Sequence, residues 1–415
     1  MSGLIEAVAP ARLGRSFRWL LASTWTSNLG DGLALAAGPL LVARLAGSPF
    51  LVALAATLQW LPPLLLGLVA GVVTDRIDRR RVVVAAGVVR VAVLGVLVAA
   101  VLTSAVGVGL VLAALFALGV AEVFGDNAES TLLPAIVDRD DLALGNARVL
   151  GGFITLQNLS GPPLGALLFA AGIALPFAAQ AVLLLAGAVL VTRIVLPAVP
   201  RRPTAPAHHE ILEALRWTWA HANVRTLVLT ILLFNVTYGA AWSVLVLYAT
   251  ERLGLGPLGY GAITTVIALG GIVATLGYGA LTRRVSLATL MRVGLLVETA
   301  THLALALTTV PWVAYIVFGA FGAHAFVWST TSVTVRQRAV PPALQGRVGS
   351  VNTVATYGGL VLGSAIGGAL AEGFGVVAPF WFAFAGSVVL VVVLWPQLAH
   401  IAHSDADAGL PSRGR

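Results

Sequence analysis

The segment Gly71–Arg81 reads GVVTDRIDRRR and separates two long apolar stretches, residues 50–73 and 82–102. A helix of about 20 apolar residues is long enough to cross the roughly 30 Å of hydrocarbon in a bilayer, and each stretch reaches that length. Two apolar runs on either side of a short, arginine-rich turn therefore predict two membrane-spanning helices joined by a loop in water. The same alternation continues along the whole chain, which makes this a polytopic membrane protein.

The composition agrees with lipid as the solvent. Hydrophobic residues make up 59% of the chain and charged residues only 10%, whereas soluble domains contain about 25% charged residues. The absence of cysteine excludes disulfides and cysteine metal sites, and we expect neither a metal nor a cofactor. The formal charge of +8 comes from arginines in short loops, so we expect no nucleic-acid partner.

We predict an all-α membrane protein with twelve transmembrane helices in two pseudo-symmetric six-helix bundles. The first apolar run follows an arginine-bearing N-terminus, but it is too long for a signal peptide and lacks a cleavage pattern. The expected spans are residues 19–43, 50–73, 82–102, 106–127, 149–171, 174–196, 226–250, 258–281, 286–309, 312–335, 348–371 and 376–397.

The arginines also predict an orientation. If both termini and alternate loops lie on one side, that side holds 22 of the 25 basic residues; Arg44 and Arg252 lie on the other side, and Arg90 lies within a span. Basic residues are retained in the cytoplasm. We therefore expect both termini in the cytoplasm and the chain in the inner (plasma) membrane.

The break in the middle of the chain differs from the other loops. Residues 197–225 are polar and carry HHEILEALRWTWAHANVR, whose helical spacing of apolar residues predicts an amphipathic helix on the cytoplasmic surface. The expected domains are an N-terminal bundle (residues 1–198), this linker (199–224), a C-terminal bundle (225–399) and a cytoplasmic tail (400–415).

Short motifs recur in the two halves in the same order and at nearly constant offset. This recurrence indicates an internal duplication, as in many transporters. The recurring elements are Asn28 and Gly32 with Asn235 and Gly239, GVVTDR at 71–76 with GALTRR at 279–284, and Gly161 and Gly165 with Gly363 and Gly367.

The chain resembles the major facilitator superfamily. The loop pattern of that family, Gly, three residues, Asp-Arg, two residues, Arg-Arg, is present at Gly71, Asp75, Arg76, Arg79 and Arg80. The strings SNLGDGLALAAGPLLVARLAGSP, EVFGDNAESTLLPAIV and EALRWTWAHANVR resemble the drug:proton antiporter branch, which includes macrolide, tetracycline and siderophore exporters. The resemblance implies a secondary transporter that exports a small amphipathic or lipophilic molecule by proton-coupled alternating access.

Two departures from that branch bear on antiport. The fourth span carries Glu122 and Asp126 and lacks the arginine found in many drug antiporters. The fifth-span antiporter pattern is reduced to Gly161, Pro162 and Gly165.

We expect the loop motif to act as a cytoplasmic gate. Gly71 would permit close helix contact, and Asp75 at a helix end would meet an arginine or a helix N-terminus. The alternative is a cluster that only retains the loop in the cytoplasm. The expected gating residues are Gly71, Asp75, Arg76, Arg79, Arg80, Arg90, Glu122, Asp126 and Arg148.

Asp31 is the expected proton carrier, because a carboxylate near the middle of a span is costly unless it faces a cavity or a partner. The alternative is a permanently ionised Asp31 paired with an arginine. In the C-terminal half, Glu298 and His302 lie on one face of the ninth span and His324 lies midway along the tenth. They are expected to exchange protons or to give structural support.

Amide and aromatic groups on apolar walls suit a lipophilic, possibly cationic substrate. The expected substrate-binding residues are Asn28, Asp31, Gln157, Asn158, Asn235, Tyr238, Trp242, His324, Trp328, Asn352 and Tyr357. The expected partners are this small molecule, protons and membrane lipid, with the protein as a monomer. Two alternatives stay open: a transporter of lysophospholipid, siderophore or another metabolite, and a membrane-embedded enzyme or sensor on the same scaffold.

Overall fold

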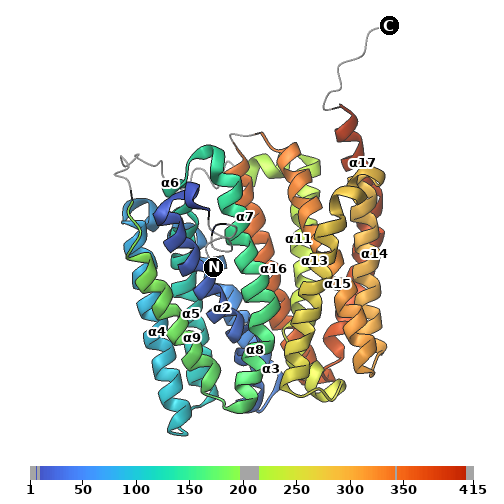
Figure 1. Ribbon diagram of the computed structural model, residues 1–415. Coiled ribbons are helices and arrows are strands. Elements are labelled where there is room, and N and C mark those ends of the chain that lie inside the picture. The colour runs from blue at the N-terminus through green and yellow to red at the C-terminus, as the bar shows by residue number, and fades with distance from the viewer. Residues whose placement is uncertain (1–5, 7–9, 197–214, 342–343, 408–415) are drawn as a thin grey trace. The chain divides into compact units, whose positions relative to one another are not determined.

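The computed structural model describes Glu6 and residues 10–196, 215–341 and 344–407. The side chains of Leu68, Asp75, Asn223 and residues 396–407 lie outside this description. Within the described ranges every regular element is a helix (Figure 1).

The helices of the N-terminal half follow one another with short connections. Proline stands in the first turn of several helices, where its fixed φ suits the start of a helix. The elements are η1 (Ala11–Leu13), α2 (Gly14–Leu45), α3 (Pro49–Arg76), α4 (Arg79–Leu102), α5 (Val108–Ser130), α6 (Leu133–Ile136), η2 (Arg139–Asp141), α7 (Leu142–Gly152), the π-helical η3 (Phe153–Ser160), α8 (Gly161–Ala171) and α9 (Leu175–Val191).

The C-terminal half follows the same scheme. Its elements are α11 (Ala222–Trp242), α12 (Leu245–Leu247), the π-helical η4 (Tyr248–Arg252), α13 (Pro257–Arg284), α14 (Leu287–Leu307), α15 (Pro311–Ala339), α16 (Gln345–Phe374) and α17 (Ala378–Asp407). Of the predicted linker helix, residues 215–220 are described and helical, with Leu215 and Trp219 exposed; the rest of that prediction lies outside the described residues.

Nine helices of the described ranges are long and apolar enough to cross a membrane. They are α3, α4, α5 with α6, α11, α13, α14, α15, α16 and α17. The 32-residue α2, the continuous segment α7–η3–α8 and the 17-residue α9 bring each half to six helical segments. The prediction of an all-α membrane protein is confirmed.

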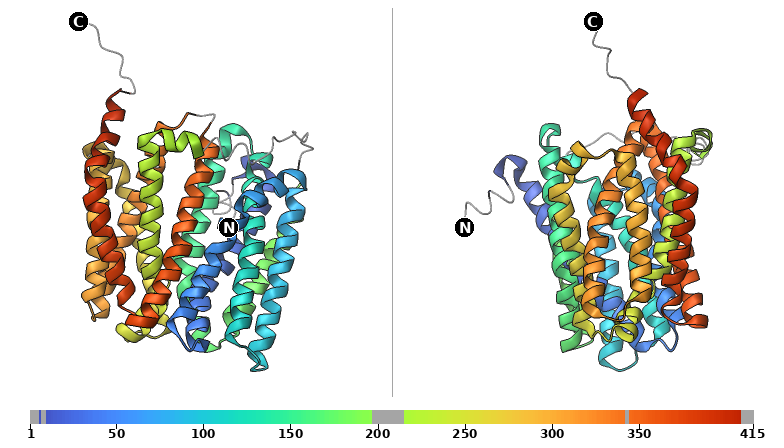
Figure 2. Two further views of the ribbon diagram at one scale, coloured as in Figure 1. Left: turned by 180° about the vertical axis from the view of Figure 1, so that it is seen from behind. Right: turned by 90° about the vertical axis from the view of Figure 1, so that its right-hand side faces the viewer.

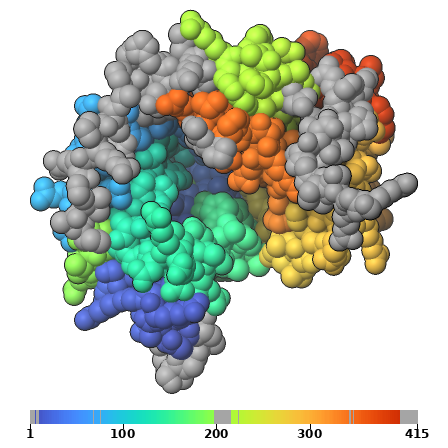
Figure 3. Space-filling view, turned by 90° about the horizontal axis from the view of Figure 1, so that it is seen from above, coloured from blue at the N-terminus to red at the C-terminus, as the bar shows by residue number. Residues whose placement is uncertain are grey.

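The chain forms two compact units, Met1–Pro203 with Gly254–Thr265, and Thr204–Leu253 with Val266–Arg415. In the first unit, α2 packs on α8 and α9, and α5 packs on both α3 and α4. The start of α2 lies beside the α6–α7 segment (Figure 3), where Phe17 and Leu20 join a core with Leu132 and Ile194. In the second unit, α11 packs on α16 and α17, and α14 packs on α15 and α17 (Figure 2).

Equivalent glycines bring equivalent helices together in the two halves. A Cβ atom at Gly165 of α8 would lie 2.1 Å from the Leu33 carbonyl oxygen of α2, so only glycine fits this approach. A Cβ atom at Gly367 of α16 would lie 2.2 Å from the Ala240 carbonyl oxygen of α11. The recurrence of Gly165 as Gly367 in the sequence therefore corresponds to equivalent contacts, α8 on α2 and α16 on α11.

Candidate functional site

Asp31, in the middle of α2, has an arginine partner. Its Oδ1 atom accepts a hydrogen bond from the Arg90 guanidinium of α4, and the two side chains are only 15% and 9% exposed. Gln180 of α9 donates to the same Oδ1 atom over 3.3 Å. Three helices thus converge on one carboxylate, and the alternative of an arginine-paired Asp31 is the arrangement in this structure.

Some polar atoms around this ion pair have no hydrogen-bond partner. Among the described residues, Nε of Arg90 and Oε1 of Gln180 are buried without a hydrogen-bond partner. Buried charges and polar groups without full hydrogen bonding are costly, and such sites in membrane helices are typical of ion or substrate pathways. The sequence analysis grouped Arg90 with the loop motif; the structure pairs it with Asp31 instead.

The face of α5 toward this pair carries further carboxylates. Glu122, Asp126 and Glu129 are spaced four and then three residues apart, which places them on one side of the helix. Arg90 interacts electrostatically with Glu122 and Asp126, and Glu129 accepts a hydrogen bond from the Thr24 hydroxyl of α2. Glu129 also interacts electrostatically with Arg90, so among the described residues of this cluster four carboxyl groups surround one guanidinium.

Glu129 was missed by the sequence analysis. It lies at the end of α5, where a carboxylate is easily interpreted as part of a solvated loop. Its helical spacing from Asp126 and Glu122 was the available signal. We refer to Asp31, Arg90, Glu122, Asp126 and Glu129 as the acidic cluster.

The loop motif connects the ends of three helices in the first unit. Arg79 donates to the Thr131 carbonyl oxygen over 3.1 Å, at the end of α5, and Arg80 donates to the Ile194 carbonyl oxygen over 3.2 Å, just after α9. Cations at the carboxyl ends of helices are favoured by the helix dipole. Asp78, not singled out from the sequence, caps α4 by accepting from the backbone N–H of Arg80 over 2.9 Å.

The predicted gate contacts of Gly71 and Asp75 are not formed by atoms that the structure describes. A Cβ atom at Gly71 would meet no described atom within 4 Å, so the predicted close helix contact at this glycine stays a prediction. Arg76 is exposed, and Trp25 donates to the Arg148 carbonyl oxygen over 3.0 Å. The side chain of Asp75 lies outside the described residues, and its predicted contact with an arginine or a helix N-terminus stays a prediction.

A second cluster lies in the interior of the other unit. Glu298 of α14 contacts His302 of the same helix, with 2.9 Å between Oε1 and Nε2, and His324 of α15, with 3.2 Å between Oε2 and Nε2. Glu298 and His302 are 0% exposed and His324 is 7% exposed. The structure thus brings together the three residues that the sequence grouped, and we call them the Glu–His cluster.

Stacked aromatic rings lie beside the Glu–His cluster. Trp242 meets His302 edge-on with ring centroids 6.0 Å apart, and it stacks on Tyr238 at 4.5 Å. Trp328 lies 6.1 Å from the His324 ring. Three of the predicted substrate-binding aromatics therefore pack beside the histidines.

The remaining predicted substrate-binding residues differ in how their polar groups are satisfied. The amide groups of Asn235 and Asn158 donate to the carbonyl oxygens of Ile231 and Phe153 in their own helical segments. Nδ2 of Asn28 and Oδ1 of Asn352 are buried without a hydrogen-bond partner among the described residues. Gln157 lies in the π-helical η3, and Tyr357 is half-buried in α16. π-helical turns are frequent at functional sites.

Comparison with known proteins adds the family. Residues 5–413 match the major facilitator family described as transmembrane secretion effectors. The multidrug efflux pump Tap of Mycolicibacterium fortuitum is 28% identical over 384 residues, covering 87% of this chain and 90% of that protein. Tap of Mycobacterium tuberculosis H37Rv is 29% identical over 408 residues, covering 92% and 94%.

Solved structures show the same fold at low identity. A bacterial homologue of the iron transporter ferroportin, in an inward-facing state, has a TM-score of 0.75 at 18% identity and covers 92% of this chain and 98% of its own. A bacterial homologue of the lysosomal transporter Spinster has a TM-score of 0.70 at 14% identity, covering 95% and 96%. The chain belongs to the transmembrane secretion effector family and is a transporter of the major facilitator type, not an enzyme.

Proposed function

We propose that this transporter exports a small lipophilic cation across the plasma membrane in exchange for protons. Its Tap relatives carry the name of multidrug efflux pumps and align over most of their length. The observation that carries the proposal is the acidic cluster, in which four carboxyl groups surround one guanidinium inside a membrane bundle. Several carboxyl groups in an apolar surrounding favour a bound cation, either a proton or the substrate.

Arg90 gives the acidic cluster two alternative arrangements. It pairs with Asp31 of α2 and also interacts with Glu122 and Asp126 of α5. A proton on Asp31 would weaken the pair and leave Arg90 to the carboxylates of α5, whereas a proton on α5 would strengthen the pair. Proton binding would thereby shift the balance between two packings of α2, α4 and α5.

The Glu–His cluster supports a second place for proton exchange, in the other half. One carboxylate held between two imidazoles can share a proton without exposing a charge to lipid. The aromatic rings packed beside it, Trp242 and Trp328, are of a kind that stacks on flat, apolar rings of a substrate. We propose that both clusters act in one exchange cycle, with both termini of the chain in the cytoplasm.

Reconstitution into sealed liposomes tests the proposal. With an imposed pH gradient, the protein should move the fluorescent cation ethidium against its concentration gradient, and ethidium addition should move protons in the opposite direction. A neutral dye of similar size should be moved at least about tenfold more slowly, because it cannot replace the cation in the acidic cluster. Ethidium uptake that ignores the pH gradient would contradict proton exchange.

Variants of α5 connect this activity to the acidic cluster. Asp126→Asn should reduce pH-driven ethidium transport by about tenfold or more, since it removes one titratable carboxylate near Arg90. Asp140→Asn, in the exposed turn η2, changes the same functional group outside the bundle and is the matched control. Equal activity of the two variants would exclude Asp126 from proton exchange.

A further inference from the structure

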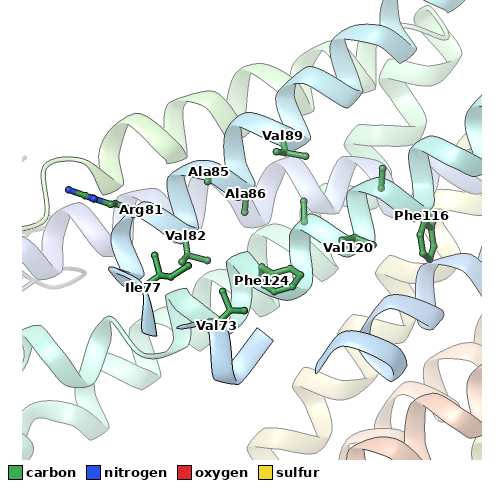
Figure 4. Close-up of a pocket in the computed structure, with 12 residues that line it drawn as sticks. Val73, Ile77, Arg81, Val82, Ala85, Ala86, Val89, Phe116, Val120 and Phe124 are labelled. Atoms are coloured by element: carbon green, nitrogen blue, oxygen red, sulfur yellow. The ribbon is translucent and has the colours of Figure 1, made fainter. Parts of the chain in front are cut away.

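A groove runs along the outside of the first bundle between the end of α3 and the helices α4 and α5 (Figure 4). It has a volume of about 700 Å³, within the range of about 300–1,000 Å³ typical of ligand pockets. Of its lining residues all but Arg81 are apolar. The lining of the groove is therefore apolar except for one positive charge, the guanidinium of Arg81.

Small side chains create this space. Ala85 and Ala86 of α4 and Ala117 and Ala121 of α5 line the groove between larger residues. Their short side chains leave the space between α4 and α5, which we call the α4–α5 seam, unfilled. Val89 is 49% exposed on the open side of the groove. Because this side belongs to membrane-spanning helices, hydrocarbon rather than water reaches it.

The length of the groove matches one leaflet. Arg81 and Val89 are eight residues apart on α4, which corresponds to about 12 Å at about 1.5 Å per residue. One leaflet contributes about 15 Å, half of the roughly 30 Å hydrocarbon thickness. In Figure 4, Arg81 lies at the end opposite Phe116, with its guanidinium beyond the apolar side chains.

Arg81 differs from its two neighbours in the contacts of its guanidinium. Its neighbours Arg79 and Arg80 donate to the carbonyl oxygens of Thr131 and Ile194. Arg81 is exposed, and among the described residues its side chain has no ion pair or hydrogen bond. A free guanidinium at the end of a helix, where the membrane meets water, is suited to a phosphate group.

A second groove on the same seam gives an internal comparison. It has a volume of about 210 Å³, shares Ala117 with the first groove and continues toward Leu97 and Leu110. All of its lining residues are apolar. Charge and apolar space therefore coincide at the Arg81 end of the seam and not at the other end.

We propose that the larger groove binds one anionic phospholipid, with an acyl chain along Ala85 and Ala121 and the phosphate on Arg81. The acyl chain fills the space left by the alanines, and each buried methylene contributes about 0.8 kcal/mol. The phosphate supplies a partner for Arg81, whose side chain has none within the part of the chain that the structure describes. The bound lipid contacts α3, α4 and α5 together and stabilises their packing beside the acidic cluster.

Lipid retention by the full-length protein tests this site. After delipidation in detergent, the protein is incubated with phosphatidylglycerol or phosphatidylcholine of identical acyl chains, and bound lipid is counted by native mass spectrometry. Phosphatidylglycerol should be retained about tenfold more strongly than phosphatidylcholine. Arg81→Gln should remove this preference, whereas Arg284→Gln, an exposed arginine in the last turn of α13, should keep it.

Filling the groove tests the acyl chain. Ala121→Leu should reduce phosphatidylglycerol retention by about tenfold, and Ala113→Leu in the smaller, uncharged groove is the matched control with no expected change. If Ala121→Leu does not fold, Ala85→Val narrows the same groove with a smaller side chain. Equal retention of both lipids by the unaltered protein, or equal effects of Ala121→Leu and Ala113→Leu, would overturn the proposal.

Discussion

At the residue scale, the buried carboxyl groups of the first bundle interact with one guanidinium, that of Arg90. Arg90 is the common partner of a carboxylate on α2 and of carboxylates on α5. Removing one member of a buried ion pair leaves the other charge unpaired, which typically costs about 3–5 kcal/mol, whereas removing both is much better tolerated.

Asp31→Asn should therefore lower the thermal unfolding temperature and abolish pH-driven transport. The double variant with Arg90→Gln should regain part of the lost stability, because no member of the Asp31–Arg90 pair is left alone, although the carboxylates of α5 lose their cation. It should stay inactive. Unfolding of the detergent-solubilised proteins measures the first effect and liposome transport the second. An Asp31→Asn protein that is stable and still transports against a gradient would exclude Asp31 as a proton carrier.

The Glu–His cluster allows a separate residue test. Glu298→Gln keeps a side chain of the same shape that still hydrogen-bonds to His302 and contacts His324, but it never ionises. We expect pH-driven transport to fall by about tenfold or more with little change in unfolding temperature. Glu251→Gln, exposed in η4, is the control. Undiminished transport would leave Glu298 with the structural role that the sequence analysis kept open.

At the element scale, helix packing depends on a few glycines with no tolerance for a side chain. Gly165 brings α8 onto α2, and Gly367 brings α16 onto α11, with separations that a Cβ atom cannot occupy. Without a strong hydrophobic force between helices in lipid, close van der Waals contact of this kind supplies much of the packing energy.

Gly165→Ala and Gly367→Ala should each lower the unfolding temperature, because the added methyl group forces the paired helices apart. Gly95→Ala, in α4, is the matched control: a Cβ atom there meets no described atom within 4 Å. Alanine favours a helix over glycine by about 1 kcal/mol, so the control should be neutral or slightly more stable. Equal effects at Gly95 and Gly165 would show that the contacts do not limit stability.

At the scale of the whole molecule, the arginine distribution predicts the orientation of all spans. A reporter active only in the cytoplasm should work when fused after residue 415 or inserted at Ala205, in the linker outside the described residues. The same reporter inserted at Ala105, between α4 and α5, should be inactive, because that turn follows an odd number of spans. Activity at Ala105 and none at residue 415 would reverse the orientation.

The sequence by itself determined the membrane class, the helices and the duplication of this protein. Apolar runs and arginine-rich turns are local features, and a helix in lipid satisfies its own backbone hydrogen bonds, so each span follows from its own residues. The recurring glycines Gly165 and Gly367 also marked equivalent contacts correctly.

Only the tertiary structure decided which polar groups meet. Asp31 and Arg90 are 59 residues apart, and Glu129 reaches Thr24 over 105 residues. Such pairs depend on how each helix is rotated and tilted against its neighbours, and side-chain packing between helices sets that rotation. For the same reason the sequence placed Arg90 with the loop motif, whereas in the structure it pairs with Asp31 and interacts with the carboxylates of α5.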